Sequence, residues 1–143
     1  MRVAHTGITV SDMGRTLAFF RDVLGFSVSP VTRHQGEDFA RITGIADPVI
    51  DIAYVDAPGH KLEILHYLAP AEKVTSSLRP CDNGHLHLAF AVKDIDALTE
   101  RVRGAGYIPV GSAPTVDEDG GIRGIYAYGP DGLVLEFMEW LAP

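Results

Sequence analysis

Two stretches of the chain, His5-Thr-Gly-Ile-Thr-Val-Ser-Asp12 and His87-Leu-Ala-Phe-Ala-Val-Lys-Asp94, share one organisation and decide the fold. In both, an aspartate follows a histidine after seven residues, and small or polar residues alternate with apolar ones between them. This alternation is typical of a half-buried strand. Its recurrence predicts that the chain is built from two copies of one structural unit.

A helical pattern follows each of these strands. We expect helices at about Met13–Leu24 and about Ile95–Ala105, because apolar residues recur there with helical spacing. A glycine follows each of these segments and favours the end of the helix. Suitable capping residues precede both helices: Ser11 or Asp12, and Asp94 or Asp96.

Three strand patterns follow each helix, roughly at Ser27–Val31, Val49–Val55, Lys61–Tyr67, Tyr107–Val110, Gly124–Gly129 and Leu133–Trp140. The order strand–helix–strand–strand–strand therefore occurs twice, and we predict one α+β domain over residues 1–143. Its first module covers about 1–68, its connector about 69–84 and its second module about 85–143. Segment Arg33–Gly44 is interpreted as a lid or as an ordinary long connection.

The last strands of the two halves also match. Both Gly59-His-Lys-Leu-Glu63 and Gly132-Leu-Val-Leu-Glu136 place a glutamate four residues after a glycine. Each glutamate interrupts an apolar strand, and burial of an unpaired carboxylate is costly. An arginine partner, a raised pKa or a bound metal ion would compensate for that cost.

The candidate metal ligands are one histidine and one glutamate from each half: His5, Glu63, His87 and Glu136. Two imidazoles and two carboxylates suit a divalent transition ion, and the metal is left open among Zn, Ni, Co, Mn and Fe. One such residue alone is more often hydrogen-bonded or solvated, so the recurrence of the pair carries the hypothesis. His85 is a neighbour of His87 or an alternative ligand, and Asp51 is interpreted as an edge charge with a catalytic role as the minor alternative. The tyrosines are interpreted as packing residues, some lining a cavity: Tyr54, Tyr67, Tyr126 and Tyr128.

Composition excludes several classes of protein. With 12 Lys and Arg against 19 Asp and Glu, the 143-residue chain has a net charge of −7 and no basic run, which argues against binding to nucleic acid or to an anionic membrane. The single cysteine, Cys81, allows no internal disulfide. The first ten residues lack the apolar core of a signal peptide, and no apolar run is long enough to span a bilayer. These features favour a soluble, cytoplasmic protein.

With these motifs, the chain resembles the vicinal-oxygen-chelate superfamily, which includes glyoxalase I and methylmalonyl-CoA epimerase. The resemblance rests on the two opening stretches and on Phe19-Phe-Arg-Asp-Val-Leu-Gly-Phe26, Lys61-Leu-Glu-Ile-Leu65 and Gly129-Pro-Asp-Gly-Leu-Val-Leu-Glu-Phe137. It implies paired βαβββ modules whose mixed sheet curves around a central metal cavity. It also implies that the first and last strands of both modules supply the ligands, at the four positions given above.

The resemblance implies a divalent-metal enzyme that transfers a proton next to the carbonyl of a small substrate chelating through two oxygens. Such an enzyme is an isomerase, epimerase or lyase, with Glu136 as our preferred base and Glu63 as the alternative. A homodimer is also implied, with the metal site inside one chain or shared between two. The alternatives are an extradiol-type ring-cleaving dioxygenase and a non-catalytic small-molecule or drug-binding resistance protein.

Overall fold

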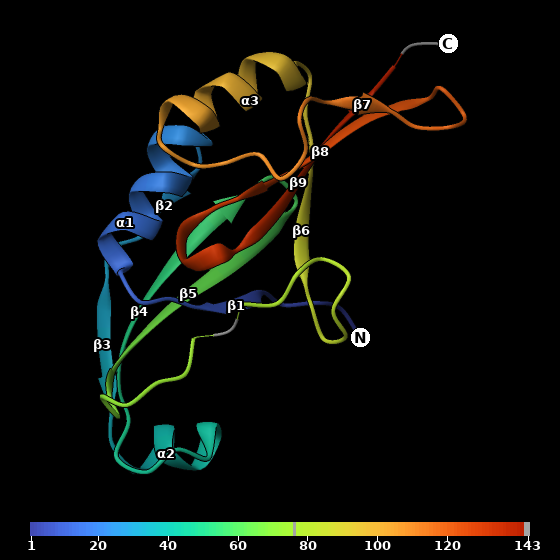
Figure 1. Cartoon of the computed structure of the whole chain (residues 1–143). Coiled ribbons are helices and arrows are strands. Elements are labelled where there is room, and N and C mark those ends of the chain that lie inside the picture. The colour runs from blue at the N-terminus through green and yellow to red at the C-terminus, as the bar shows by residue number, and fades with distance from the viewer. Residues whose placement is uncertain (76, 142–143) are drawn as a thin grey trace. The chain divides into compact units, whose positions relative to one another are not determined.

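The computed structural model describes residues 1–75 and 77–141. It divides into two compact units, Met1–Thr75 and Ser76–Pro143, each built on its own mixed sheet (Figure 1). The connector expected over 69–84 contains residue 76, which lies outside the described residues. Among the described residues, no helix has the length and apolar character needed to cross a bilayer.

The sheet of the first unit has the strand order β1-β5-β4-β2, and β3 also pairs with β4. β1 runs parallel to β5, whereas the other neighbours are antiparallel. The first strand of the unit therefore lies beside its last strand. The elements are β1 Thr6–Thr9, α1 Met13–Ala18, η1 Phe19–Val23, β2 Ser27–Val28, β3 Thr32–Gln35, α2 Glu37–Thr43, β4 Val49–Ala57 and β5 His60–Ala69.

The sheet of the second unit has the strand order β6-β9-β8-β7, again with the first strand parallel to the last. This repeats the plan of the first unit, and the predicted α+β fold of two βαβββ modules is confirmed. The elements are β6 His87–Ala91, α3 Ile95–Gly104, β7 Thr115–Val116, β8 Ile122–Tyr128, η2 Pro130–Gly132 and β9 Val134–Trp140.

The helices begin where their capping residues predict. The side chains of Asp12 and Asp94 each accept a hydrogen bond from a backbone N–H three residues later, at 2.9 Å in both cases. These bonds satisfy donors that have no partner inside the helix. The second helix ends at Gly104, one residue before the predicted end.

The predicted helix Met13–Leu24 changes type along its length. It is α-helical to Ala18 and continues as the π-helix η1. Phe19 and Phe20 are both buried there, and their rings meet edge to face with centroids 5.5 Å apart. The wider π turn directs two consecutive aromatic rings into the core, a feature that helical spacing in the sequence does not reveal.

The first unit differs from prediction after its first helix. The expected strand Ser27–Val31 ends at Val28, since Pro30 lacks the N–H that a sheet ladder requires. Segment Arg33–Gly44 contains most of β3 and all of α2. The segment is therefore largely regular secondary structure rather than an ordinary long connection, and the lid alternative stays a prediction.

The second unit differs from prediction in the same part of its module. The expected strand Tyr107–Val110 is wrong as a strand, because only one isolated bridge forms there, between Pro109 and Ala127. Pro109 again removes a ladder donor. The strand that pairs with β8 at this edge is β7, later in the chain.

The core lies on one face of each sheet. The residues that flank the two glutamates along their strands are at most 1% exposed: Leu62, Ile64, Leu135 and Phe137. Because side chains alternate along a strand, Glu63 and Glu136 each project from the face of their own sheet that lies away from these buried residues. The apolar pattern of β5 and β9 thereby fixes the side from which both carboxylates emerge.

Candidate functional site

The structure brings the four predicted ligands together as two His–Glu pairs, one within each unit. His5 Nε2 lies 3.2 Å from Glu63 Oε2, and His87 Nε2 lies 3.2 Å from Glu136 Oε2. The two pairs thus have the same composition and the same closest separation.

Parallel pairing of the first and last strands creates each His–Glu pair. Gly7 is the register partner of Glu63, and Ala89 is the register partner of Glu136. His87 is the first residue of β6, whereas His5 directly precedes β1 rather than lying on the strand as predicted. Each histidine stands two residues before that small residue, and side chains two residues apart along extended backbone share a face. A Cβ atom on Gly7 would lie 3.4 Å from Leu65 Cδ1 and 3.9 Å from Glu63 Oε2, both ordinary contact distances, so the small residue packs directly beside the carboxylate.

The carboxylates of the two His–Glu pairs are partly buried. The side chains of Glu63 and Glu136 are 15% and 22% exposed, whereas those of His5 and His87 are 43% and 37% exposed. Within residues 1–75 and 77–141, neither glutamate forms an ion pair with Lys or Arg. A partly desolvated carboxylate beside an accessible imidazole is a suitable half-site for a cation.

Each His–Glu pair supplies two donors, one imidazole and one carboxylate. In the described part of the chain, no cluster of three or more His, Cys, Asp or Glu residues has the spacing to hold a metal ion. The four-residue ligand set therefore stays a prediction, and the structure carries two halves of it.

A tyrosine stands opposite each glutamate on the neighbouring strand. Tyr54 on β4 is the register partner of Glu63, and Tyr126 on β8 is the register partner of Glu136. Both tyrosines were interpreted from sequence as packing residues. They precede the glutamates by nine and ten residues across equivalent hairpins, and because these offsets differ, only the strand register reveals that their positions match.

The two tyrosines make different contacts. Tyr54 Oη donates a hydrogen bond to Glu63 Oε1 at 2.8 Å, and this bond to the carboxylate raises the pKa of the Tyr54 phenol. The ring of Tyr126 instead packs against that of His87, with centroids 5.2 Å apart. Burial, and then the charge of Glu136, raise the pKa of the Tyr126 phenol.

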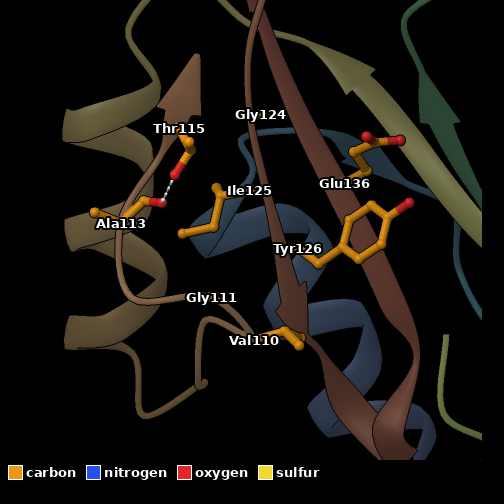
Figure 2. Close-up of a pocket in the computed structure, with 8 residues that line it drawn as sticks. All are labelled: Val110, Gly111, Ala113, Thr115, Gly124, Ile125, Tyr126 and Glu136. Carbon is orange, nitrogen blue, oxygen red and sulfur yellow. Dashed lines mark hydrogen bonds between the residues drawn. The ribbon is translucent and has the colours of Figure 1, made fainter. Parts of the chain in front are cut away.

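A pocket of about 430 Å³ opens beside Glu136 in the second unit (Figure 2). Glu136 is its one charged lining residue among those described, and Thr115 and Tyr126 supply hydroxyls. Thr115 Oγ1 donates to the carbonyl oxygen of Ala113 at 3.1 Å. The residues that line the pocket are Val110, Gly111, Ala113, Thr115, Gly124, Ile125, Tyr126 and Glu136.

His85 lies close to the second pair without joining it in a ligand cluster. Its ring stacks on that of His87 with centroids 6.2 Å apart. Its Nε2 is buried and has no hydrogen-bond partner among the described residues. His85 is therefore a neighbour of His87, and its role as an alternative ligand stays a prediction.

Asp51 lies in a separate ion pair. Arg33 on β3 donates to both carboxylate oxygens of Asp51 on β4, at 2.8 and 3.0 Å. The expectation of an edge charge is wrong in position, because β4 pairs with β5 on one side and with β2 and β3 on the other; the ion pair with Arg33 compensates the carboxylate instead. The hydrogen bond from Arg33 lowers the pKa of the Asp51 carboxyl.

Arg33→Met should therefore lower stability most at neutral pH. A carboxyl with a lowered folded-state pKa adds stability above its unfolded pKa of about 3.9, and this is lost as the pH falls through the folded-state value. We expect the urea midpoints of wild type and Arg33→Met to differ at pH 7 and to converge below about pH 3. A difference that stays constant over this range would contradict the assignment.

Comparisons with a family model, with curated sequences and with solved structures all find proteins of one superfamily or epimerases. The model of the Glyoxalase/Bleomycin resistance protein/Dioxygenase superfamily matches residues 2–137, a range that includes both His–Glu pairs. The chain is 31% identical to 2-epi-5-epi-valiolone epimerase of Actinomyces sp., over 96% of this chain and 78% of that protein. It is 28% identical to ethylmalonyl-CoA/methylmalonyl-CoA epimerase of Cereibacter sphaeroides, over 78% and 75% of the two chains. A solved glyoxalase family protein from Bacillus cereus superposes with a TM-score of 0.87 at 25% identity, covering 99% of this chain and 95% of that one.

Proposed function

Because the chain belongs to the Glyoxalase/Bleomycin resistance protein/Dioxygenase superfamily, we propose that it is a divalent-metal-dependent epimerase or a closely related isomerase or lyase. The proton is moved at the carbon next to the carbonyl of a small substrate that chelates through two oxygens. One observation carries this proposal: a His–Glu pair with the same 3.2 Å contact is built at the same place in both units. The similarity to two epimerases supports the reaction class.

The donor set fits a divalent ion. We propose that both His–Glu pairs ligate one ion, which is Zn, Ni, Co, Mn or Fe. Two carboxylates balance the charge of a divalent cation, and the neutral imidazoles are ligands that all five metals accept. The bound ion would supply Lewis-acid polarisation of the substrate carbonyl, which lowers the pKa of the adjacent C–H.

The glutamates carry the proton in this proposal. Glu136 takes it from the carbon next to the carbonyl, and either Glu136 or Glu63 returns it. Return to the opposite face gives the epimer, whereas return to the neighbouring carbon or oxygen gives an isomer. The open pocket beside Glu136 gives a substrate access to this carboxylate.

The experiment combines metal analysis with solvent exchange. Protein purified without a tag or chelator is analysed for bound metals, and metal-loaded protein is incubated in D₂O with the substrates that name the two epimerase relatives. We expect near-stoichiometric metal, and solvent deuterium at the epimerised carbon that disappears on chelation. Protein that holds no metal after reloading with each of the five ions would overturn the proposal.

The same samples separate the other function classes. Oxygen consumption by ferrous-loaded protein with a catechol-like diol would identify a dioxygenase. Tight binding of a small molecule that survives removal of the metal, without turnover, would identify a binding protein. Either result would replace the epimerase proposal.

We further propose that the chain acts as one vicinal-oxygen-chelate domain in a cytoplasmic homodimer with a small-molecule substrate. Light scattering during size exclusion measures the mass. Mixing a first-pair variant with a second-pair variant then tests whether two chains share the site. Metal binding recovered in the mixture would show sharing, and its absence would place the site within one chain.

A further inference from the structure

The two tyrosines opposite the glutamates occupy equivalent positions but are used differently. Each is the cross-strand partner of its glutamate in the antiparallel ladder between the last two strands of its unit. A side chain at this position lies on the same sheet face as the carboxylate. Each glutamate therefore has a tyrosine at the equivalent position. The two tyrosine–glutamate pairs can be compared directly, and a different contact marks a difference between the two units.

In the first unit, the phenol fixes the carboxylate. Glu63 Oε1 accepts a hydrogen bond from Tyr54 Oη at 2.8 Å, and Glu63 Oε2 lies 3.2 Å from His5 Nε2. Both oxygens are thus engaged, and the side chain is only 15% exposed. A hydrogen bond to a ligand's second oxygen orients the ligand and commonly changes metal affinity 10- to 100-fold, a rough range for such contacts.

In the second unit, the carboxylate lacks this restraint. Glu136 meets His87 through Oε2, and among the described residues it accepts no hydrogen bond from Tyr126 or another side chain. Figure 2 shows Tyr126 and Glu136 side by side on adjacent strands. The Tyr126 hydroxyl has no hydrogen-bond partner in the described part of the chain, although its ring is held against His87.

The pocket beside Glu136 gives that hydroxyl a possible partner. Apart from Glu136, its lining is uncharged, so the pocket suits an uncharged part of a ligand. Gly124 lies on the same face as Tyr126, and a Cβ added there would meet nothing closer than 3.9 Å, so the sheet face at Gly124, which also lines the pocket, is not filled by other side chains. A phenol beside a carboxylate can donate to a hydroxyl or carbonyl oxygen of such a ligand.

We propose that Tyr54 is a positioning residue that holds Glu63 as a fixed ligand, whereas Tyr126 hydrogen-bonds an uncharged oxygen of the substrate and leaves Glu136 free to carry the proton. This inference rests on the proposed function, because it treats both glutamates as ligands. It predicts opposite phenotypes for two chemically identical substitutions, Tyr54→Phe and Tyr126→Phe. Each variant is the matched control for the other.

Metal affinity tests the role of Tyr54. Cobalt is titrated into metal-free protein in competition with a chromophoric chelator. We expect Tyr54→Phe to weaken binding about 10-fold or more and to change the visible spectrum of bound cobalt, whereas Tyr126→Phe stays within about 2-fold of wild type. Equal affinities in all three proteins would overturn this half of the proposal. Thermal unfolding of the metal-free proteins checks that loss of affinity does not follow from loss of fold.

Two small chelating probes test the role of Tyr126. Acetohydroxamate and glycolohydroxamate both chelate through two oxygens, but only the second carries an additional hydroxyl. We expect Tyr126→Phe to weaken glycolohydroxamate about 3- to 10-fold more than acetohydroxamate, the rough value of one hydrogen bond. Equal effects on both probes, measured by calorimetry with cobalt-loaded protein, would overturn this half.

The outcomes distinguish this inference from the function on which it rests. Wild-type protein that binds no cobalt would remove the proposed function and the inference together. Wild-type protein that binds cobalt, with two indistinguishable tyrosine variants, would leave the metal site standing and would remove the inference alone.

Discussion

Replacing both His5 and His87 by alanine is expected to reduce bound metal from near-stoichiometric to less than about one-tenth. The substitution removes the two imidazoles, one from each His–Glu pair. A tenfold loss of affinity corresponds to about 1.4 kcal/mol of binding free energy. Removal of two of the four ligands is expected to cost more binding free energy than this. Mass-spectrometric metal analysis after equal dialysis of both proteins measures the change.

A matched double variant, His34→Ala/His66→Ala, removes two histidines outside the pairs. The ring of His34 packs on Phe39, and His66 is the register partner of Asp51. This control should keep its metal. Equal loss from both double variants, or metal retained without His5 and His87, would contradict the assignment of the ligands.

Glu136→Gln is expected to lower kcat by about 10³-fold, within the usual 10²- to 10⁴-fold contribution of a general base. Glutamine keeps the size of the side chain and an oxygen donor but does not accept the proton. The rate of solvent-deuterium incorporation by metal-loaded protein measures the effect, and metal content is determined in the same sample. Turnover unchanged in a metal-loaded variant would exclude Glu136 as the base.

Glu139→Gln is the matched control for that change. Glu139 lies three residues after Glu136 on β9 and therefore projects from the other face of the strand. Arg123 Nη1 donates a hydrogen bond to Glu139 Oε2 at 3.1 Å. Its loss should affect the ion pair without changing kcat. A fall in kcat as large as that of Glu136→Gln would indicate a general effect on the strand rather than removal of a base.

The repeated sequence predicted the elements that carry the pairs. His5 and His87, with the glutamates on the last strands, were identifiable because strand alternation places each of them away from an apolar face. The 3.2 Å contacts within each pair agree with the expectation that the first and last strands of a module act together. The assembly of four ligands around one metal stays a prediction.

Features that depend on three-dimensional pairing were not predictable in the same way. Tyr54 and Tyr126 acquire meaning only through the register that places each opposite a glutamate. Alternation along one strand does not specify the register of its neighbour. The irregular strands after the first helix of each module also escaped prediction, because Pro30 and Pro109 each remove a ladder donor from an otherwise strand-like segment.

The parallel pairing of β1 with β5 and of β6 with β9 has a consequence for the order of folding. Each pairing joins the two ends of its unit, so most of the unit must be synthesised before its closing strand is available. Contacts so distant in sequence carry a loop-closure cost and generally form slowly. The first His–Glu pair therefore forms only after β5 has been synthesised, and the second only after β9. In the proposed four-ligand site, metal acquisition would therefore require both units to be complete, rather than local helix formation alone.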